Sequence, residues 1–377
     1  MEFELRTSRA LPESVDQSTQ SQTLFDTIPD ALKAIRNGEC VVVVDDERRE
    51  NEGDLICAAQ FATPEQINFM ATEARGLICL AMQGDRLDSL DLPLMVDRNT
   101  DANQTAFTVS IDAGPEHGVS TGISAEDRSR TIQVAIQSES RPSDLRRPGH
   151  IFPLRARPGG VLKRAGHTEA AVDLAQLAGL NSSGVICEIM NDDGEMARRD
   201  DLVAFCQHHG LKMGTIADLV AYRLKTESLI ERIGDEAFAT EYGSAFRLVT
   251  FREPEDPAAP EILALVKGEI SPDVPTLTRV HALNMRLDLL GAGGASKLPA
   301  AIRAVDSEGA GVIVLINSPD SMDRLPPEQA LRTYGLGAQV LRSLGVRDMT
   351  LLSNANRELV GLDGFGLQVV GYRPLDL

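Results

Sequence analysis

The stretch VVVVDDERRENEGDLICAAQ, residues 41–60, holds a charged segment between two apolar runs. Residues 40–44 and 55–59 have the apolar, β-branched character of buried strands. Between them, eight of the ten residues from Asp45 to Asp54 are charged, six acids and two arginines. A short turn between strands favours Gly, Asn or Asp instead. The segment is therefore expected to do more than connect two strands.

Length and composition indicate a globular chain with two domains. The chain has 377 residues, of which 42% are hydrophobic and 25% charged, and this length favours two domains, each large enough for its own core. We expect a polar, disordered tail at 1–22, a first domain at 23–228 and a second at 229–377. The tail lacks the apolar stretch of a secretory signal, and no window approaches the roughly 18 apolar residues of a membrane span. A cytoplasmic location is the expectation.

Charge and cysteine usage exclude several functional classes. The net charge of −19 would repel nucleic acid and anionic membranes, so neither is an expected partner. An anionic small substrate would need local cations or a metal. Most cysteines lie in apolar runs, so we expect reduced, buried thiols. The sequence has no CxxC pair, so we expect no structural zinc site. The cysteines are Cys40, Cys57, Cys79, Cys187 and Cys206.

Hydrophobic periodicity places the main elements. Helices are predicted at 25–37 and 64–75, and another beginning after Ser124, whose side chain can cap it. A strand is predicted at 106–111, and residues 138–163, rich in Pro, Arg and Gly, are predicted to be a long loop. Beyond residue 235 or so, strand patterns (FRLVTF, GVIVLI, MTLLS) alternate with helical ones, which indicates an α/β arrangement.

The alternation of Glu50, Glu52 and Asp54 suggests a metal site. If this segment is extended, the three carboxylates face one side, and they repel one another unless a cation lies among them. A divalent ion such as Mg²⁺ or Mn²⁺ suits hard oxygen ligands, and Arg49 could hold an anion. The alternative is a solvated, salt-bridged loop, which composition alone favours.

A second informative stretch is RAGHTEAAVDLAQLAG, residues 164–179. Thr168 can cap a helix, and Gly166 and His167 directly precede it. Backbone N–H groups at a helix N-terminus, together with Arg164, make a suitable cradle for a phosphate. The alternative is that Thr168 is only a cap and His167 only a surface residue.

Two further candidates are less decided. His150 lies in RRPGHIFPL, where an exposed histidine without a role is the common outcome. Glu188 lies within the apolar run GVICEIM, where a buried acid is either paired or functional.

Five segments in this order carry a family resemblance: DDERRENEGDLI, STGISAEDRSRTIQ, RPGHIFPL, RAGHTEAAVDL and VICEIMNDDGEMAR. They resemble 3,4-dihydroxy-2-butanone 4-phosphate synthase of riboflavin biosynthesis over about residues 23–225. The resemblance implies an α+β fold and a lyase that converts ribulose 5-phosphate to L-3,4-dihydroxy-2-butanone 4-phosphate and formate. It also implies a Mg²⁺ or Mn²⁺ cofactor, two ions per site, and a homodimer with its sites at the subunit interface.

The resemblance assigns roles by motif position. It implies metal ligation by Glu50 and His167 and proton transfer by His150 and Glu188, and it places Cys79 and Asp127 near the site. The implied substrate and phosphate contacts are Arg49, Glu50, Asp54, Arg164, Ala165, Gly166, His167, Thr168 and Glu188.

The second half resembles GTP cyclohydrolase II over about residues 237–377, through PTLTRVH, LRTYGLGAQVLRSLGV and LLSNANRELVGLDGFGLQVVGYRPL. The family's three zinc-binding cysteine positions hold Asn284, Gly294 and Ser296. NSPDSMDRL replaces its GTP-binding QEGRG stretch, and Ala330 replaces the acid two residues before the retained Arg332. We therefore expect an α/β domain that has lost cyclohydrolase chemistry, binds no zinc and has a structural or regulatory role.

Two rival functions remain open on sequence alone. One is a bifunctional enzyme with working GTP cyclohydrolase II activity, which zinc and GTP-turnover measurements would reveal. The other is a non-catalytic phosphosugar-binding scaffold, which formate release from ribulose 5-phosphate would exclude.

Overall fold

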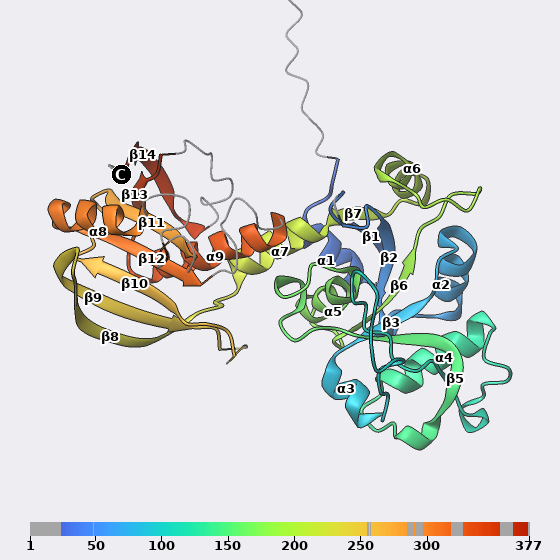
Figure 1. Ribbon diagram of the computed structural model, residues 1–377. Coiled ribbons are helices and arrows are strands. Elements are labelled where there is room, and N and C mark those ends of the chain that lie inside the picture. The colour runs from blue at the N-terminus through green and yellow to red at the C-terminus, as the bar shows by residue number, and fades with distance from the viewer. Residues whose placement is uncertain are drawn as a thin grey trace, which may run out of the picture.

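The computed structural model describes two sheet-containing units joined through a helix (Figure 1). Its described residues are 24–47, 49–254, 256, 258–284, 288, 290, 297–317, 327–354 and 365–375, with only the backbone at 327–331. The tail expected at 1–22 lies outside them. No helix in these ranges is long and apolar enough to cross a membrane. The domain limits 23–228 and 229–377 stay a prediction.

The N-terminal unit is built on a mixed sheet of seven strands, counted over the described residues. The strand order is β4-β5-β3-β6-β2-β1-β7. β1 pairs antiparallel with β2 and parallel with β7, so the two strands around the charged segment are neighbours in the sheet. The strands are β1 (Val41–Val44), β2 (Gly53–Ala58), β3 (Cys79–Met82), β4 (Ile111–Ala113), β5 (Leu145–Arg155), β6 (Ser183–Glu188) and β7 (Lys212–Thr215).

Helices cover both faces of this sheet. Because side chains alternate along a strand, Val41 and Val43 join one buried core, and Val42 and Val44 join the other. The first core packs against α1, α5 and α7, and the second against α2, α4 and α6. This three-layer arrangement confirms the expected α+β fold. The helices are α1 (Ile28–Arg36), α2 (Pro64–Phe69), α3 (Gly84–Ser89), α4 (Ala125–Ile136), α5 (His167–Leu177), α6 (Arg199–His209) and α7 (Ile216–Thr226), with single turns at Ala59–Phe61, Met70–Ala74, Pro115–His117, Pro142–Asp144 and Gly160–Leu162.

Local sequence explains the helix starts. Thr27 caps α1 by accepting from the backbone N–H of Asp30 at 3.3 Å. Ser124 caps α4 as predicted, because its hydroxyl accepts from the backbone N–H of Asp127 at 3.0 Å. Both contacts satisfy a backbone donor that the first turn of a helix leaves without a partner.

Two predicted elements are wrong. The long loop predicted at 138–163 contains the eleven-residue strand β5, which pairs with β3 and β4. Pro148 and Gly149 have the composition of a loop, but Ile151 is buried and tertiary pairing outweighs the local signal. The strand predicted at 106–111 is mostly irregular, with isolated bridges at Phe107 and Thr108.

The C-terminal unit has a second mixed sheet, also of seven strands over the described residues, in the order β14-β13-β11-β12-β10-β9-β8. α9 packs on one face and α8 on the other, each over its own buried core. This is the α/β arrangement expected from the alternating patterns. The elements are β8 (Glu231–Thr240), β9 (Gly243–Arg252), β10 (Ile262–Lys267), β11 (Thr276–Leu283), α8 (Lys297–Glu308), β12 (Gly311–Asn317), α9 (Pro327–Ser343), β13 (Asp348–Leu352) and β14 (Gln368–Arg373).

The two units meet where α7 packs against α9. The Gln339 side chain donates to the carbonyls of Leu224 at 2.7 Å and Glu227 at 2.8 Å and accepts from the N–H of Leu229 at 2.8 Å. A single buried amide of α9 thus satisfies the backbone at the end of α7. Gly335 lets the helices approach, because a Cβ there would lie 2.7 Å from the Leu224 side chain.

The close packing of α5 on β6 yields a stability prediction. A Cβ at Gly184 would lie 2.8 Å from the Cβ of Ala171 in α5, so Gly184→Ala should destabilise the fold by about 1–3 kcal/mol through overpacking. Urea unfolding measures the change. Gly214→Ala in β7 is the matched control, because its Cβ would lie 3.6 Å from Ile28, an ordinary contact. Equal stability of the two variants would contradict this account of α5 packing.

Candidate active site

Asp45 organises the charged segment into a closed turn. Its buried carboxylate accepts from the backbone N–H of Glu50 at 3.2 Å and of Glu52 at 2.9 Å. It also pairs with Arg49 at 2.7 Å, and Arg49 in turn pairs with Glu50 at 2.5 Å. Asn51 has a left-handed backbone with φ of 53°, so the segment is not extended from Glu50 to Asp54 and the condition for one shared carboxylate face is not met. The turn around Asp45, and not the alternation of a strand, sets the direction of the Glu50 side chain.

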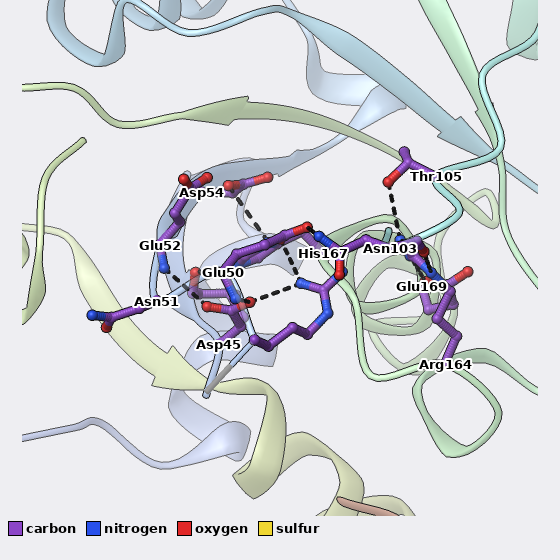
Figure 2. Close-up of polar contacts among 12 residues, drawn as sticks. Asp45, Glu50, Asn51, Glu52, Asp54, Asn103, Thr105, Arg164, His167 and Glu169 are labelled. Atoms are coloured by element: carbon purple, nitrogen blue, oxygen red, sulfur yellow. Dashed lines mark hydrogen bonds and ion pairs between the residues drawn. The ribbon is translucent and has the colours of Figure 1, made fainter. Parts of the chain in front are cut away.

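His167 begins α5 and faces the same carboxylates. Its Nδ1 lies 3.7 Å from Glu50 Oε2 and 3.6 Å from Asp54 Oδ1 (Figure 2). Its Nε2 lies 3.1 Å from the carbonyl oxygen of Val43 in β1. Because a carbonyl can only accept, this contact keeps a proton on Nε2 and turns Nδ1 towards the acids. When the imidazole is neutral, its Nδ1 therefore presents a lone pair to the site.

The electrostatics of this cluster are strongly perturbed. Burial, together with the charges of Glu188 and Glu50, raises the pKa of Asp54 to about 7. Burial also disfavours a charged His167, but the carboxylates of Asp54 and Glu50 outweigh it and raise the histidine's pKa to about 9. Although burial opposes its ionisation, the contacts with His167 and Arg49 lower the pKa of Glu50 to about 2. Near neutral pH the carboxylates of this cluster thus stabilise a positively charged group among them, such as a protonated His167.

These side chains fit a divalent cation. In the described part of the chain, Asp45, Glu50 and His167 are the one group of three potential ligand residues whose donor atoms all lie within 4.8 Å of one another. Beside them, the buried Oδ1 of Asp54 makes no hydrogen bond with any described residue. Carboxylate oxygens are the donors that Mg²⁺ and Mn²⁺ prefer. A bound cation would satisfy the unpaired oxygen and reduce the repulsion among the acids.

Arg164 lies on the other side of His167 in a second group of polar contacts (Figure 2). Its Nη1 pairs with the buried Glu169 at 2.6 Å. Its Nε and Nη2 donate to the carbonyl of Asn103, each at 3.2 Å, and Nη2 also donates to Thr105 Oγ1 at 3.1 Å. A Cβ at Gly166 would lie 2.3 Å from Arg164 Nη1, so a side chain there would displace the guanidinium from this position.

The helix start differs from the prediction. Gly166, and not Thr168, is the N-cap of α5, and its cap has no side-chain hydrogen bond. Thr168 is buried within the first turn. The predicted run from Arg164 through Ala165 to Thr168 therefore places backbone N–H groups beside the arginine, as a phosphate cradle requires.

Two further residues near the site, Glu188 and Cys79, lie on strands β6 and β3 of the sheet. Glu188 ends β6 directly opposite Asp54 in the antiparallel register, so both side chains occupy one face of the sheet. Glu188 Oε2 accepts from the backbone N–H of Leu77 at 2.8 Å. Burial, with the charges of Glu188 and Asp54, raises the pKa of Cys79 well above the usual range. Cys79 is therefore a neutral thiol and not a nucleophile.

Two candidates do not join this cluster within the chain. His150 lies exposed on β5, where its Nδ1 pairs with Asp112 at 2.8 Å. Asp127 accepts from the N–H groups of Ser120 at 3.1 Å and Gly122 at 3.0 Å, so it shapes the loop before α4.

Sequence reasoning missed four residues that the structure brings to the site: Asp45, Asn103, Thr105 and Glu169. Asp45 belonged to the charged run, but no periodicity distinguished it from its neighbours. Glu169 could have been suspected as an acid in the first turn of α5, close in sequence to Arg164. Asn103 had no local signal, because it acts partly through its backbone carbonyl.

The cyclohydrolase-like positions are only partly described. Asn284 follows β11, and its backbone N–H donates to Asp288 at 2.8 Å. Arg332 on α9 pairs with Glu253. Gly294, Ser296, most of NSPDSMDRL and the side chain of Ala330 lie outside the described residues. The sequence itself has no cysteine after Cys206.

Both halves match known families. Residues 29–222 match the family model for 3,4-dihydroxy-2-butanone 4-phosphate synthase, and residues 231–374 match that for GTP cyclohydrolase II. The riboflavin biosynthesis protein RibBA of Synechocystis sp. is 52% identical over 93% of this chain and 68% of its own length. The overall likeness therefore extends through both units.

Two solved structures are also similar. RibBX, a two-domain 3,4-dihydroxy-2-butanone 4-phosphate synthase from A. baumannii, is 43% identical, with a TM-score of 0.78 over 93% of this chain and 100% of that one. A 3,4-dihydroxy-2-butanone 4-phosphate synthase in complex with two magnesium ions is 48% identical, with a TM-score of 0.51 over 54% of this chain and 98% of that one.

Proposed function

The chain belongs to the 3,4-dihydroxy-2-butanone 4-phosphate synthase family, with a GTP cyclohydrolase II family domain following, and we propose that the cluster around Glu50 and His167 is its catalytic centre. Its enzyme class is therefore that of this synthase, a lyase of riboflavin biosynthesis. The proposed reaction converts ribulose 5-phosphate to L-3,4-dihydroxy-2-butanone 4-phosphate and formate.

The observation that carries the proposal is the convergence of Glu50, Asp54 and His167 beside Arg164. His167 Nδ1 lies within 3.7 Å of both carboxylates. Arg164 and the first N–H groups of α5 lie next to them and fit the phosphate of the substrate. The site can thus hold both ends of ribulose 5-phosphate: the hydroxyketone end at the Glu50 cluster and the phosphate end at Arg164.

Glu50 and His167 are the proposed metal ligands, and Asp45 is added by its position in the same group. A relative crystallised with two magnesium ions supports Mg²⁺, and we extend the proposal to two ions per site with Mn²⁺ as a substitute. When bound, the ions would supply Lewis-acid stabilisation of the negative charge that develops on adjacent sugar oxygens.

The residues themselves position the sugar and move protons. Enolisation, loss of water, skeletal rearrangement and release of formate each require a proton to leave or join carbon or oxygen. Glu188, at the end of β6 and on the same face as Asp54, is a proposed proton carrier. The backbone N–H of Leu77 holds its Oε2, which fixes the carboxylate's direction.

Formate release tests this function. Purified protein with Mg²⁺ should release one formate for each ribulose 5-phosphate consumed. Glu50→Gln and His167→Ala should each lower kcat by at least about 100-fold, because both remove a group that holds charge at the reacting centre. Glu47→Gln is the matched control, since this acid lies in the same segment but its side chain is exposed.

Full activity in both site variants would remove the site assignment. Absence of formate from the wild-type protein, with ribulose 5-phosphate bound unchanged, would instead support the phosphosugar-binding scaffold.

His150 enters the proposal through a second subunit. It pairs with Asp112 on β5 and has no hydrogen bond or ion pair to the Glu50 cluster among the contacts of the described residues. The family resemblance implies a homodimer with its sites at the subunit interface, and we propose that His150 of one protomer reaches the site of its partner. A C2 arrangement would then create two equivalent shared sites.

Mixed dimers test the shared site. A dimer of one Glu50→Gln protomer and one His150→Ala protomer has one site with both changes and one site with neither. It should recover about half of the wild-type activity, whereas each variant alone is inactive. Isolated mixed dimers that remain as inactive as the single variants would show that His150 does not act across subunits.

The second unit supports the phosphate side of the site through direct contacts. Lys163, which precedes Arg164, lies 3.7 Å from Glu253 and also pairs with Asp256. Within the first unit, Arg223 of α7, the helix that packs against α9, pairs with Asp173 of α5 at 2.8 Å and donates to the carbonyl of Gly159 at 2.9 Å. We propose that the second unit steadies residues 159–164 directly through Lys163 and indirectly through α7, and a regulatory role is compatible with these contacts.

We propose that cyclohydrolase chemistry has been lost, because the family's zinc site uses three cysteines and none occurs after Cys206. The full-length protein should contain no stoichiometric zinc by metal analysis and should not turn over GTP when zinc is added. One zinc per chain together with GTP-dependent product would establish the bifunctional alternative.

A further inference from the structure

The segment from Asn99 to Thr105 connects the two halves of the candidate site. We propose that Asn103 is a positioning residue that holds the metal carboxylate Glu50 and the phosphate arginine Arg164 at a fixed separation. The inference rests on the proposed function, because that function gives Glu50 and Arg164 their roles. Figure 2 shows Asn103 lying between them.

The side chain of Asn103 contacts the metal half. Its Nδ2 donates to Oε1 of Glu50 at 2.8 Å. The other oxygen, Oε2, then faces His167 Nδ1 at 3.7 Å and Arg49 at 2.5 Å. By holding one oxygen, Asn103 thus limits rotation of the carboxylate and keeps the other oxygen facing the histidine.

The backbone of Asn103 contacts the phosphate half. Its carbonyl accepts from both Nε and Nη2 of Arg164, each at 3.2 Å. Thr105 Oγ1 accepts from the same Nη2 at 3.1 Å, and Glu169 holds Nη1 from the opposite side at 2.6 Å. The guanidinium plane is therefore fixed on two edges, one of which belongs to this segment.

The segment is ordered by its own hydrogen bonds. Asn99 Nδ2 donates to the carbonyl of Thr105 at 2.9 Å, and Asp101 accepts from the N–H of Thr105 at 3.0 Å. Gln104 has a left-handed backbone with φ of 51°, directly after Asn103. A non-glycine residue in that region is held there by its surroundings, and such positions cluster at functional sites. The closed loop thus supports the contact that Asn103 makes.

Asn103 contacts Glu50 through its side chain and Arg164 through its backbone carbonyl. A side-chain mutation can therefore remove the first contact and keep the second. Asn103→Ala removes only the amide to Glu50 and keeps the carbonyl that accepts from Arg164. It should weaken Mg²⁺ binding by about 10-fold or more, the usual effect of losing a partner that orients a ligand. At saturating Mg²⁺ its KM for ribulose 5-phosphate should change little.

Thr105→Val should show the opposite pattern, since it removes a contact of Arg164 alone. Its Mg²⁺ affinity should equal that of the wild type, while its KM rises severalfold. Asn99→Ala is the control for loop order, because the Asn99 amide closes the same segment without contacting Glu50 or Arg164. It should lower Mg²⁺ affinity by less than Asn103→Ala does, because the contact between Asp101 and Thr105 still closes the segment.

The experiment is Mg²⁺ titration calorimetry on the full-length protein without substrate, followed by KM measurement at saturating Mg²⁺. Thermal unfolding confirms that each variant is folded, and Asn103→Ser replaces Asn103→Ala if the latter is not. Unchanged Mg²⁺ affinity in the Asn103 variant, equal losses in the Asn99 and Asn103 variants, or no Mg²⁺ binding by the wild type would each overturn the inference. Because calorimetry needs no turnover, a wild type that binds Mg²⁺ but releases no formate would refute the proposed function separately.

Discussion

The structure of the site depends on the imidazole of His167 held between a carbonyl and two carboxylates. Val43 accepts from Nε2 at 3.1 Å, and Glu50 and Asp54 face Nδ1 at 3.7 and 3.6 Å. Buried acids at this spacing repel one another strongly unless a positive charge lies among them. A proton on His167 supplies that charge in the metal-free chain, and a divalent cation supplies it when bound. The acids of the charged segment can therefore lie close together, since His167 at the start of α5 lies beside them.

The fold brings these groups together through neighbouring strands and one closely packed helix. β1 ends and β2 begins around the charged turn, and β6 places Glu188 opposite Asp54. α5 can approach the sheet because Gly184 leaves space for Ala171. The position of His167 thus follows from core packing as much as from local sequence. The second unit adds a contact between Glu253 and Lys163, which lies in the segment directly before α5.

The family resemblance implied the α+β fold of the first unit. Sequence patterns predicted the α/β second unit and most of the elements that carry the site, because strands and caps give local signals. They failed at β5, where Pro148 and Gly149 gave a loop signal that long-range pairing overrode. The proximity of Glu50 to His167 was anticipated for a partly wrong reason, since Asp45 and not strand alternation directs Glu50. Asn103 could not be predicted, because its importance arises only where distant segments meet.

The central claim is that the acids of the early strand junction and the imidazole at the start of α5 hold one cation. Crystals of the full-length protein soaked in Mn²⁺ and measured at the manganese absorption edge would test it directly. The account predicts an anomalous peak within about 2.5 Å of both a Glu50 oxygen and His167 Nδ1. A well-occupied peak elsewhere, or Glu50 and His167 separated in every protomer and across every subunit contact, would contradict it.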